Sequence, residues 1–175
     1  MNQPFNKALL VLAFLTATAC SVQIAENLIM RLLPLPFIRI GLSNVIILYL
    51  IQRKQVLNAV IVNVTKSLVG GLATFTLLSP GTLLSLGGGF AAVLVMWAAD
   101  RLPLGFSVFG ISVLGAVAHN LVQLSIVKSV VLPQADVFIL TPILLVLALL
   151  GGFVTAWILL AVQAKYQLQR FNDGD

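Results

Sequence analysis

Residues 137–164 read VFILTPILLVLALLGGFVTAWILLAVQA and contain no Asp, Glu, Lys or Arg. A helix needs about 20 apolar residues to cross the hydrocarbon core of a bilayer, and this stretch is long enough. Its apolar residues are continuous, whereas the strands of a membrane barrel alternate apolar and polar positions. The stretch therefore predicts a transmembrane helix.

The rest of the chain has the same character. Of its 175 residues, 60% are hydrophobic and 9% are charged, whereas soluble domains carry about 25% charged residues. The mean hydropathy is +1.10. This composition excludes a soluble enzyme, a disordered protein and a secreted module built on disulfides. We predict an all-α fold, a polytopic membrane protein with six transmembrane helices in one bundle, because six spans use about 120 residues and leave room for short loops.

Turn signals divide the chain. Ser79–Pro80–Gly81 and the segment 102–105 are typical of tight connections. Pro34 and Pro36 exclude a continuous helix between the first two spans. A single integral membrane domain over residues 1–175 follows, with predicted spans at about 8–25, 41–52, 56–78, 82–99, 106–131 and 137–164.

The basic residues predict the topology. Six spans put both termini on one side of the membrane, together with most of the basic residues: Lys7, Arg53, Lys54, Arg101, Lys165 and Arg170, against Arg31, Arg39 and Lys128 on the other side. By the positive-inside rule we expect both termini in the cytoplasm and a location in the cell (inner) membrane. The formal net charge of +5 then reflects topology, and no nucleic-acid partner is expected.

Lys66 is the charge that topology does not explain, because it lies near the middle of the third predicted span. A charge at the centre of a span costs about 2.5–3.5 kcal/mol on insertion scales and usually faces a cavity or a partner. Asn63 and Gly70 share its helix face. Two interpretations stay open: Lys66 contacts a ligand, or it is a structural partner of Glu26 or of backbone carbonyls.

A second polar group lies in the fifth predicted span. His119 and Gln123 are four residues apart and face the same way, with Asn120 on the adjacent face. They line a substrate site or only form interhelical hydrogen bonds. Gly41 and Asn44, at the start of the second span, and Arg39 beside them complete the set of candidate binding residues: Arg39, Gly41, Asn44, Lys66, His119, Asn120 and Gln123.

Two patterns of small residues have alternative interpretations. The run Gly87–Gly89, expected near a helix start, could offer backbone N–H groups to an anion or allow close helix packing. Ala13, Ala17 and Ser21 form a stripe on the first span. That stripe packs inside the chain or docks another membrane subunit.

Several chemistries are excluded by the residues themselves. The sequence has no nucleotide-binding motif, no Asp-rich pair to hold Mg²⁺ on a diphosphate and no metal-ligand set, so we expect no catalytic residue, no metal and no cofactor. What remains is a basic, amide-rich cavity with apolar walls. Such a pocket suits a small anion with a hydrophobic portion.

Three motifs carry a family resemblance. PLPFIRIGLSN (34–44), LLSPGTLLSLGGG (77–89) and GAVAHNLVQL (115–124) resemble the Gx transporter family, also named heptaprenyl diphosphate synthase component I. Arg39 stands where that family usually has Lys. The family looks related to the substrate-binding S components of energy-coupling-factor (ECF) transporters, and the resemblance covers almost the whole chain.

The resemblance implies a mechanism. Six helices capture a small anionic molecule, for example one that resembles an isoprenoid diphosphate, from outside, and the loop between spans one and two gates the site. The small-residue face at Ala13 and Ala17 meets a transmembrane coupling subunit that carries two ATPases. The alternative is a non-catalytic membrane accessory subunit of a polyprenyl diphosphate synthase or of a membrane redox complex.

Overall fold

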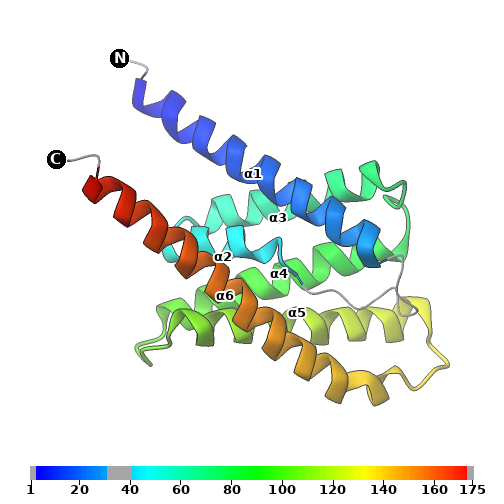
Figure 1. Ribbon diagram of the computed structural model, residues 1–175. Coiled ribbons are helices and arrows are strands. Elements are labelled where there is room, and N and C mark those ends of the chain that lie inside the picture. Colours follow the sequence, from blue (N-terminus) through cyan, green and yellow to red (C-terminus); the bar gives the residue numbers. More distant parts are fainter. Residues whose placement is uncertain (1–2, 31–40, 173–175) are drawn as a thin grey trace.

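The computed structural model describes residues 3–30 and 41–172, and this part of the chain is helical, with no strand (Figure 1). Two short non-α turns, η1 and η2, separate the last two long helices. The elements, in chain order, are α1 (Gln3–Met30), α2 (Asn44–Gln52), α3 (Val56–Ala73), α4 (Pro80–Arg101), α5 (Val108–Ile126), the π-helical turn η1 (Val127–Val131), the 3₁₀ turn η2 (Val137–Leu140) and α6 (Thr141–Asn172).

Five of these helices are long and apolar enough to cross a membrane: α1, α3, α4, α6, and α5 together with η1. The expectation of six spans is therefore not met by α2, which has 9 residues. At 1.5 Å per residue, α2 is about 14 Å long, roughly half the thickness of the hydrocarbon core. Backbone geometry sets its length, because Gly41 before it and Lys54 after it both have positive φ. The chain is thus a multi-pass membrane protein with one half-length helix.

The other predicted boundaries shift by a few residues. The first helix continues through Glu26 and Asn27, beyond the predicted end of the span at Ala25. The third helix ends at Ala73 instead of Leu78, because residues 74–79 form turns with Phe75 at positive φ. The predicted loop with Pro34 and Pro36 lies outside the described residues.

The helices run back and forth between two ends of the bundle. Both chain termini and the connections 53–55 and 102–107 lie at one end, and the connections 74–79 and 132–136 lie at the other (Figure 1). Charged side chains gather at the terminal end, where Lys54 Nζ lies 2.5 Å from Asp100 Oδ2. Arg53 and Arg101 lie over the rings of Tyr49 and Trp97 there.

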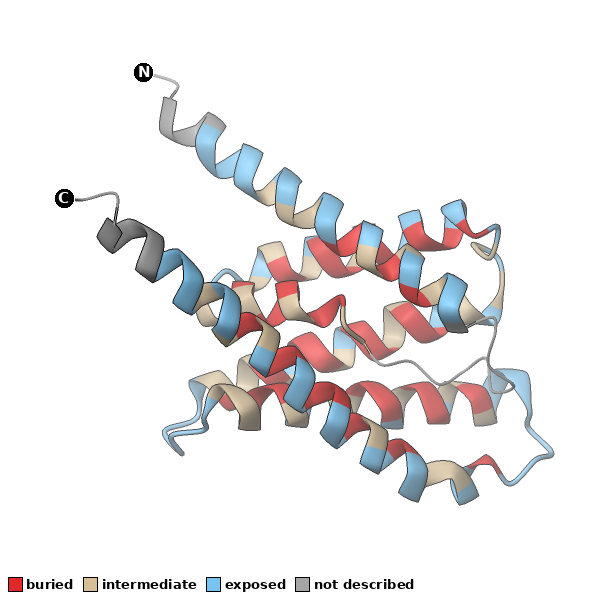
Figure 2. Ribbon diagram, viewed as in Figure 1, coloured by how far each residue is buried: buried red, intermediate tan, exposed pale blue. Residues whose placement is uncertain are grey.

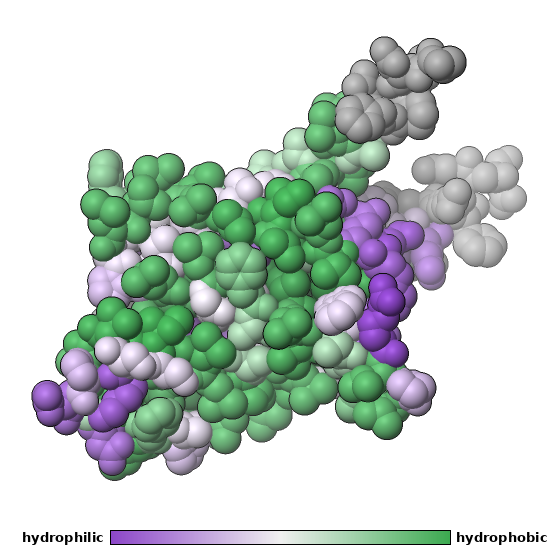
Figure 3. Space-filling model, turned by 180° about the vertical axis from the view of Figure 1, so that it is seen from behind, coloured by the Kyte–Doolittle hydropathy of each residue, from purple (hydrophilic) through white to green (hydrophobic). Residues whose placement is uncertain are grey.

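Apolar side chains cover the sides of the bundle between these ends. Figure 2 shows buried residues on the inner faces of the helices and exposed residues on the outer faces of α1 and α6. Seen from behind, the surface is mostly hydrophobic, with hydrophilic patches at the two ends (Figure 3). Exposed leucine and phenylalanine side chains, such as Leu10, Phe14 and Phe153, are costly in water and favourable in lipid. This distribution matches a bilayer around the middle of the bundle.

Helices α5 and α6 approach closely at Gly152. A Cβ atom added there would lie 2.7 Å from the Cα atom of Val113 and 3.0 Å from its backbone nitrogen. Backbone atoms cannot move aside as a side chain can, so only glycine fits this contact.

We therefore predict that Gly152→Ala destabilises the protein. Overpacking typically costs about 1–3 kcal/mol, which exceeds the roughly 1 kcal/mol that alanine gains over glycine in a helix. The control is Gly110→Ala, where the nearest atom to the added Cβ lies at 3.5 Å. Thermal unfolding in detergent should show a lower midpoint for Gly152→Ala only. An equal or higher midpoint for Gly152→Ala would contradict the α5–α6 contact.

Candidate functional site

Two buried charges hold the start of α2. Glu26 of α1 accepts hydrogen bonds from the backbone N–H groups of Leu42 (2.8 Å) and Ser43 (3.3 Å). Lys66 of α3 donates to Ser43 Oγ (2.9 Å) and to Asn44 Oδ1 (2.7 Å). Glu26 is 6% exposed and Lys66 is 1% exposed. The carboxylate thus occupies the N-terminus of α2, where free N–H groups favour a negative charge.

The ammonium group of Lys66 fixes the direction of a chain of hydrogen bonds. An ammonium only donates, so Ser43 Oγ accepts from Lys66 and donates its own proton to Gln23 Oε1 (2.9 Å). Gln23 Nε2 then donates to Asn27 Oδ1 (3.2 Å). Asn27 Nδ2 lies 3.4 Å from the carbonyl oxygen of Gly70, to which it donates. One charge therefore orients polar groups of α1, α2 and α3.

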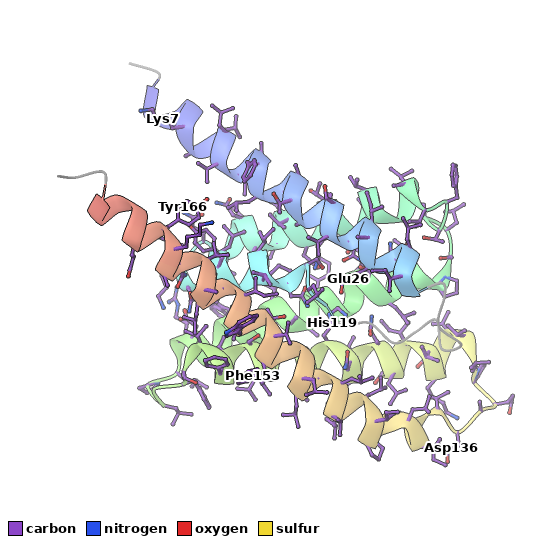
Figure 4. The ribbon with its side chains drawn as sticks, viewed as in Figure 1. Lys7, Glu26, His119, Asp136, Phe153 and Tyr166 are labelled. Atoms are coloured by element: carbon purple, nitrogen blue, oxygen red, sulfur yellow. The ribbon has the colours of Figure 1, made fainter. Side chains whose placement is uncertain are left out.

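A small cavity lies on the other side of Asn44. It is partly open to the outside, and its enclosed part, about 10 Å³, has room for roughly one water molecule. Helix α5 contributes most of the polar lining, and Figure 4 places His119 in the middle of the bundle, far from Lys7 and Asp136 at its two ends. The lining residues are Gly41, Asn44, Met96, Ser112, Ala116, His119, Asn120, Ala148 and Thr155.

Four of the seven binding residues predicted from the sequence meet at this cavity: Gly41, Asn44, His119 and Asn120. Lys66 is not among the lining residues, but it donates a hydrogen bond to Asn44, which is. Gln123 follows His119 one turn later on the buried face of α5. Arg39 lies outside the described residues.

Ser112 and Thr155 also line the cavity and were not predicted from the sequence. Ser112 precedes His119 by seven residues, so helical spacing places it on the same face of α5, and this signal could have found it. Thr155 lies on α6, where hydroxyl groups satisfied by the helix backbone look the same in sequence as groups that line a cavity.

The glycine run packs helices together. Gly87–Gly89 lie in the interior of α4 and not near its start, so their N–H groups are used within the helix and face no anion. A Cβ atom on Gly88 would lie 2.9 Å from His119 Nε2, and a Cβ atom on Gly89 would overlap the side-chain amide of Asn63. Of the two interpretations, the structure supports close packing.

Lys128 and the small-residue stripe of α1 both lie outside the cavity lining. The ammonium of Lys128 donates to the carbonyl oxygens of Pro133 and Ala135, both at 3.0 Å, and so binds the loop after η1. Ala13, Ala17 and Ser21 are all exposed on α1, while Gln23 and Glu26 face the bundle. The small-residue stripe is therefore not used for packing against the described part of this chain.

We predict that Ser43→Ala disrupts the network. The substitution removes an acceptor from Lys66 and a donor from Gln23 Oε1. Each buried polar group left unsatisfied costs about 1–3 kcal/mol, so stability should fall by about 2 kcal/mol. Ser125→Ala is the control, because that exposed hydroxyl bonds only to its own helix. Thermal unfolding in detergent measures both, and equal midpoints for the two variants would contradict this role of Ser43.

Comparison with known proteins identifies the family to which the chain belongs. No curated protein and no solved structure matches the chain. A protein-family profile described as Heptaprenyl diphosphate synthase component I matches residues 15–162, which is most of the chain and includes the start of α2, Lys66 and the cavity residues of α5. Among the described residues, no group of three or more His, Cys, Asp or Glu side chains could hold a metal ion. The chain belongs to the heptaprenyl diphosphate synthase component I family.

Proposed function

We propose that this protein is the substrate-binding membrane subunit of a transporter, similar to the S components of ECF transporters. The observation that carries the proposal is the cavity, at which Asn44, His119 and Asn120 converge from α2 and α5. A small concave site with a few polar groups and apolar walls is the usual form of a small-molecule binding site. Its position among membrane-spanning helices favours a substrate that is captured within the bilayer-embedded domain.

A binding role fits the chemistry of the lining better than a catalytic role. Amides, hydroxyl groups and one imidazole line the cavity, together with Met96 and alanine side chains. The described lining residues include no carboxylate to hold Mg²⁺ on a diphosphate or to act as a general base. The family description names a component of a synthase, which is compatible with a non-catalytic subunit.

The exposed stripe on α1 supports docking to a coupling subunit. Ala13, Ala17 and Ser21 present a narrow surface, and small side chains let two membrane helices approach closely. In this proposal the partner helix belongs to a transmembrane coupling subunit, and two ATPases on that subunit supply the energy for transport.

The orientation in the membrane is also part of the proposal. Lys7 lies toward the terminal end of the bundle (Figure 4), and so does the connection 53–55 (Figure 1), which includes Arg53 and Lys54. Lys54 bonds Asp100, next to Arg101 at the end of α4. Basic residues near short connections are enriched on the cytoplasmic side. We place both termini in the cytoplasm and the protein in the cell (inner) membrane, so that the opposite end receives the substrate.

The second candidate is a non-catalytic accessory subunit of a polyprenyl diphosphate synthase, and the family description favours it. In that case the polar network around Lys66 only stabilises the bundle, and the α1 stripe binds the synthase. The two candidates differ in the partner that copurifies with the chain.

We predict that a tagged chain, purified from its native membrane, carries an ATPase with a phosphate-binding loop. Ala17→Leu should reduce the recovered ATPase at least tenfold, because the larger side chain blocks close helix approach. Ala161→Leu is the matched control, since Ala161 is an exposed alanine of α6 outside the stripe. Quantitative mass spectrometry of the purified complexes measures the difference.

Two results would contradict the transporter proposal. Recovery of a prenyl synthase without an ATPase would favour the accessory subunit. Equal ATPase recovery with Ala17→Leu and with Ala161→Leu would show that the α1 stripe does not dock the coupling subunit.

A further inference from the structure

Two arginines at the terminal end of the bundle each lie over an aromatic ring. The guanidinium carbon of Arg53 is 5.4 Å from the centre of the Tyr49 ring, at the end of α2. That of Arg101 is 5.8 Å from the Trp97 ring, at the end of α4. Both arginines are exposed, whereas both aromatic residues are partly buried. Each cation–π contact limits where its guanidinium group can lie, so the two charges are held near fixed positions.

A salt bridge joins the ends of these two helices. Lys54 follows Arg53 in the sequence and pairs with Asp100. Asp100 in turn precedes Arg101, and its side chain is only 13% exposed. The charges of Lys54 and Asp100 therefore cancel between α2 and α4. Neither guanidinium group has an ion-pair or hydrogen-bond partner among the described residues, so two positive charges remain at this junction without an anion.

The backbone at Lys54 indicates why a lysine occupies this position. Its φ is +60°, its N–H group donates to the carbonyl oxygen of Ile51 (2.8 Å), and the N–H group of Gln55 donates to that of Leu50 (2.9 Å). These two bonds form the Schellman motif, whose left-handed residue is usually glycine because a Cβ atom is unfavourable there. A lysine gives up this advantage and supplies the ammonium group that neutralises Asp100. The carboxylate is thereby prevented from repelling an anion at the arginines.

The depth of the arginines along their helices fits the phosphate groups of a bilayer. Tyr and Trp side chains are enriched at the membrane–water interface, which places Tyr49 and Trp97 at that level. Arg53 and Arg101 each follow their ring by four residues, about 6 Å farther along the helix toward the terminal end (Figure 1). The surface at this end is hydrophilic and adjoins the apolar sides of the bundle (Figure 3).

We propose that the junction of α2 and α4 binds the phosphate groups of anionic phospholipids. Guanidinium groups form paired, charge-assisted hydrogen bonds with phosphate oxygens, and basic residues beside membrane-spanning helices attract anionic headgroups. A zwitterionic headgroup carries its own cation, whereas an anionic one matches the two free positive charges. Such a lipid fixes the end of α2, whose start is held by Glu26 and Lys66. This site is separate from the cavity, and it does not depend on the transport role.

The test is native mass spectrometry of the full-length chain in detergent, titrated with lipids. Dioleoylphosphatidylglycerol is anionic, and dioleoylphosphatidylcholine has the same acyl chains with a zwitterionic headgroup. We expect the phosphatidylglycerol to bind at least tenfold more tightly, because only its charge complements the two arginines. Inorganic phosphate, added as a competitor at the same concentration, distinguishes a free anion from a lipid headgroup and should displace no lipid.

The variants are Arg53→Gln and Arg101→Gln, and the matched control is Lys165→Gln. Lys165 is an exposed basic residue of α6, so all three substitutions change the net charge equally. Each arginine variant should bind phosphatidylglycerol at least fivefold more weakly, because the phosphate loses a charge-assisted contact, while the control keeps its affinity. The thermal midpoint without lipid shows whether each variant is folded. If an arginine variant is not, the comparison of the two lipids on the unsubstituted chain decides.

Three outcomes would overturn the proposal. Equal affinity for the two lipids would show that the headgroup charge is not recognised. Displacement by inorganic phosphate would show that the ligand is a free anion. An equal loss of affinity in Lys165→Gln and in the arginine variants would show a general attraction between charges and no site at the junction of α2 and α4. None of these measurements involves the ATPase or a transported substrate, so their results are independent of the transporter proposal.

Discussion

The buried ammonium of Lys66 organises the centre of this protein. A lysine is rarely 1% exposed unless its donors are satisfied, and here Ser43 and Asn44 accept from it. Glu26 holds the same turn through two backbone N–H groups. Glu26 and Lys66 thus both form hydrogen bonds with residues 42–44. These bonds offset the cost of burying each charge, and they fix where α2 begins.

Because α2 is only about half as long as a membrane span, its first residues lie between this network and the cavity. Because α2 starts at Asn44, in the interior of the bundle, its first residues face the polar side chains of α5 rather than a membrane surface. The glycines of α4 allow the packing of His119 and Asn63 beside it, so the polar residues of α3 and α5 fit without larger gaps.

Much of this could be predicted from the sequence. The scarcity of charge indicated a helical membrane protein, and Lys66 and His119 stood out because polar residues in apolar helices are costly. The length of α2 could not be predicted, since its apolar residues continue the pattern of a span. Glu26 or backbone carbonyls were the expected structural partners of Lys66. The hydrogen bonds from its ammonium to Ser43 and Asn44 were not predicted, because the approach of these residues depends on the tertiary fold.

Hydrogen exchange of the Lys66→Met variant tests most directly whether this ammonium organises the start of α2. Exchange reports local opening residue by residue. If Lys66 anchors residues 42–44, peptides covering α2 should exchange at least tenfold faster than in the unsubstituted chain, while peptides covering α5 and α6 stay as protected as before. Unchanged protection of α2 in a folded Lys66→Met variant would contradict the central role given to this residue.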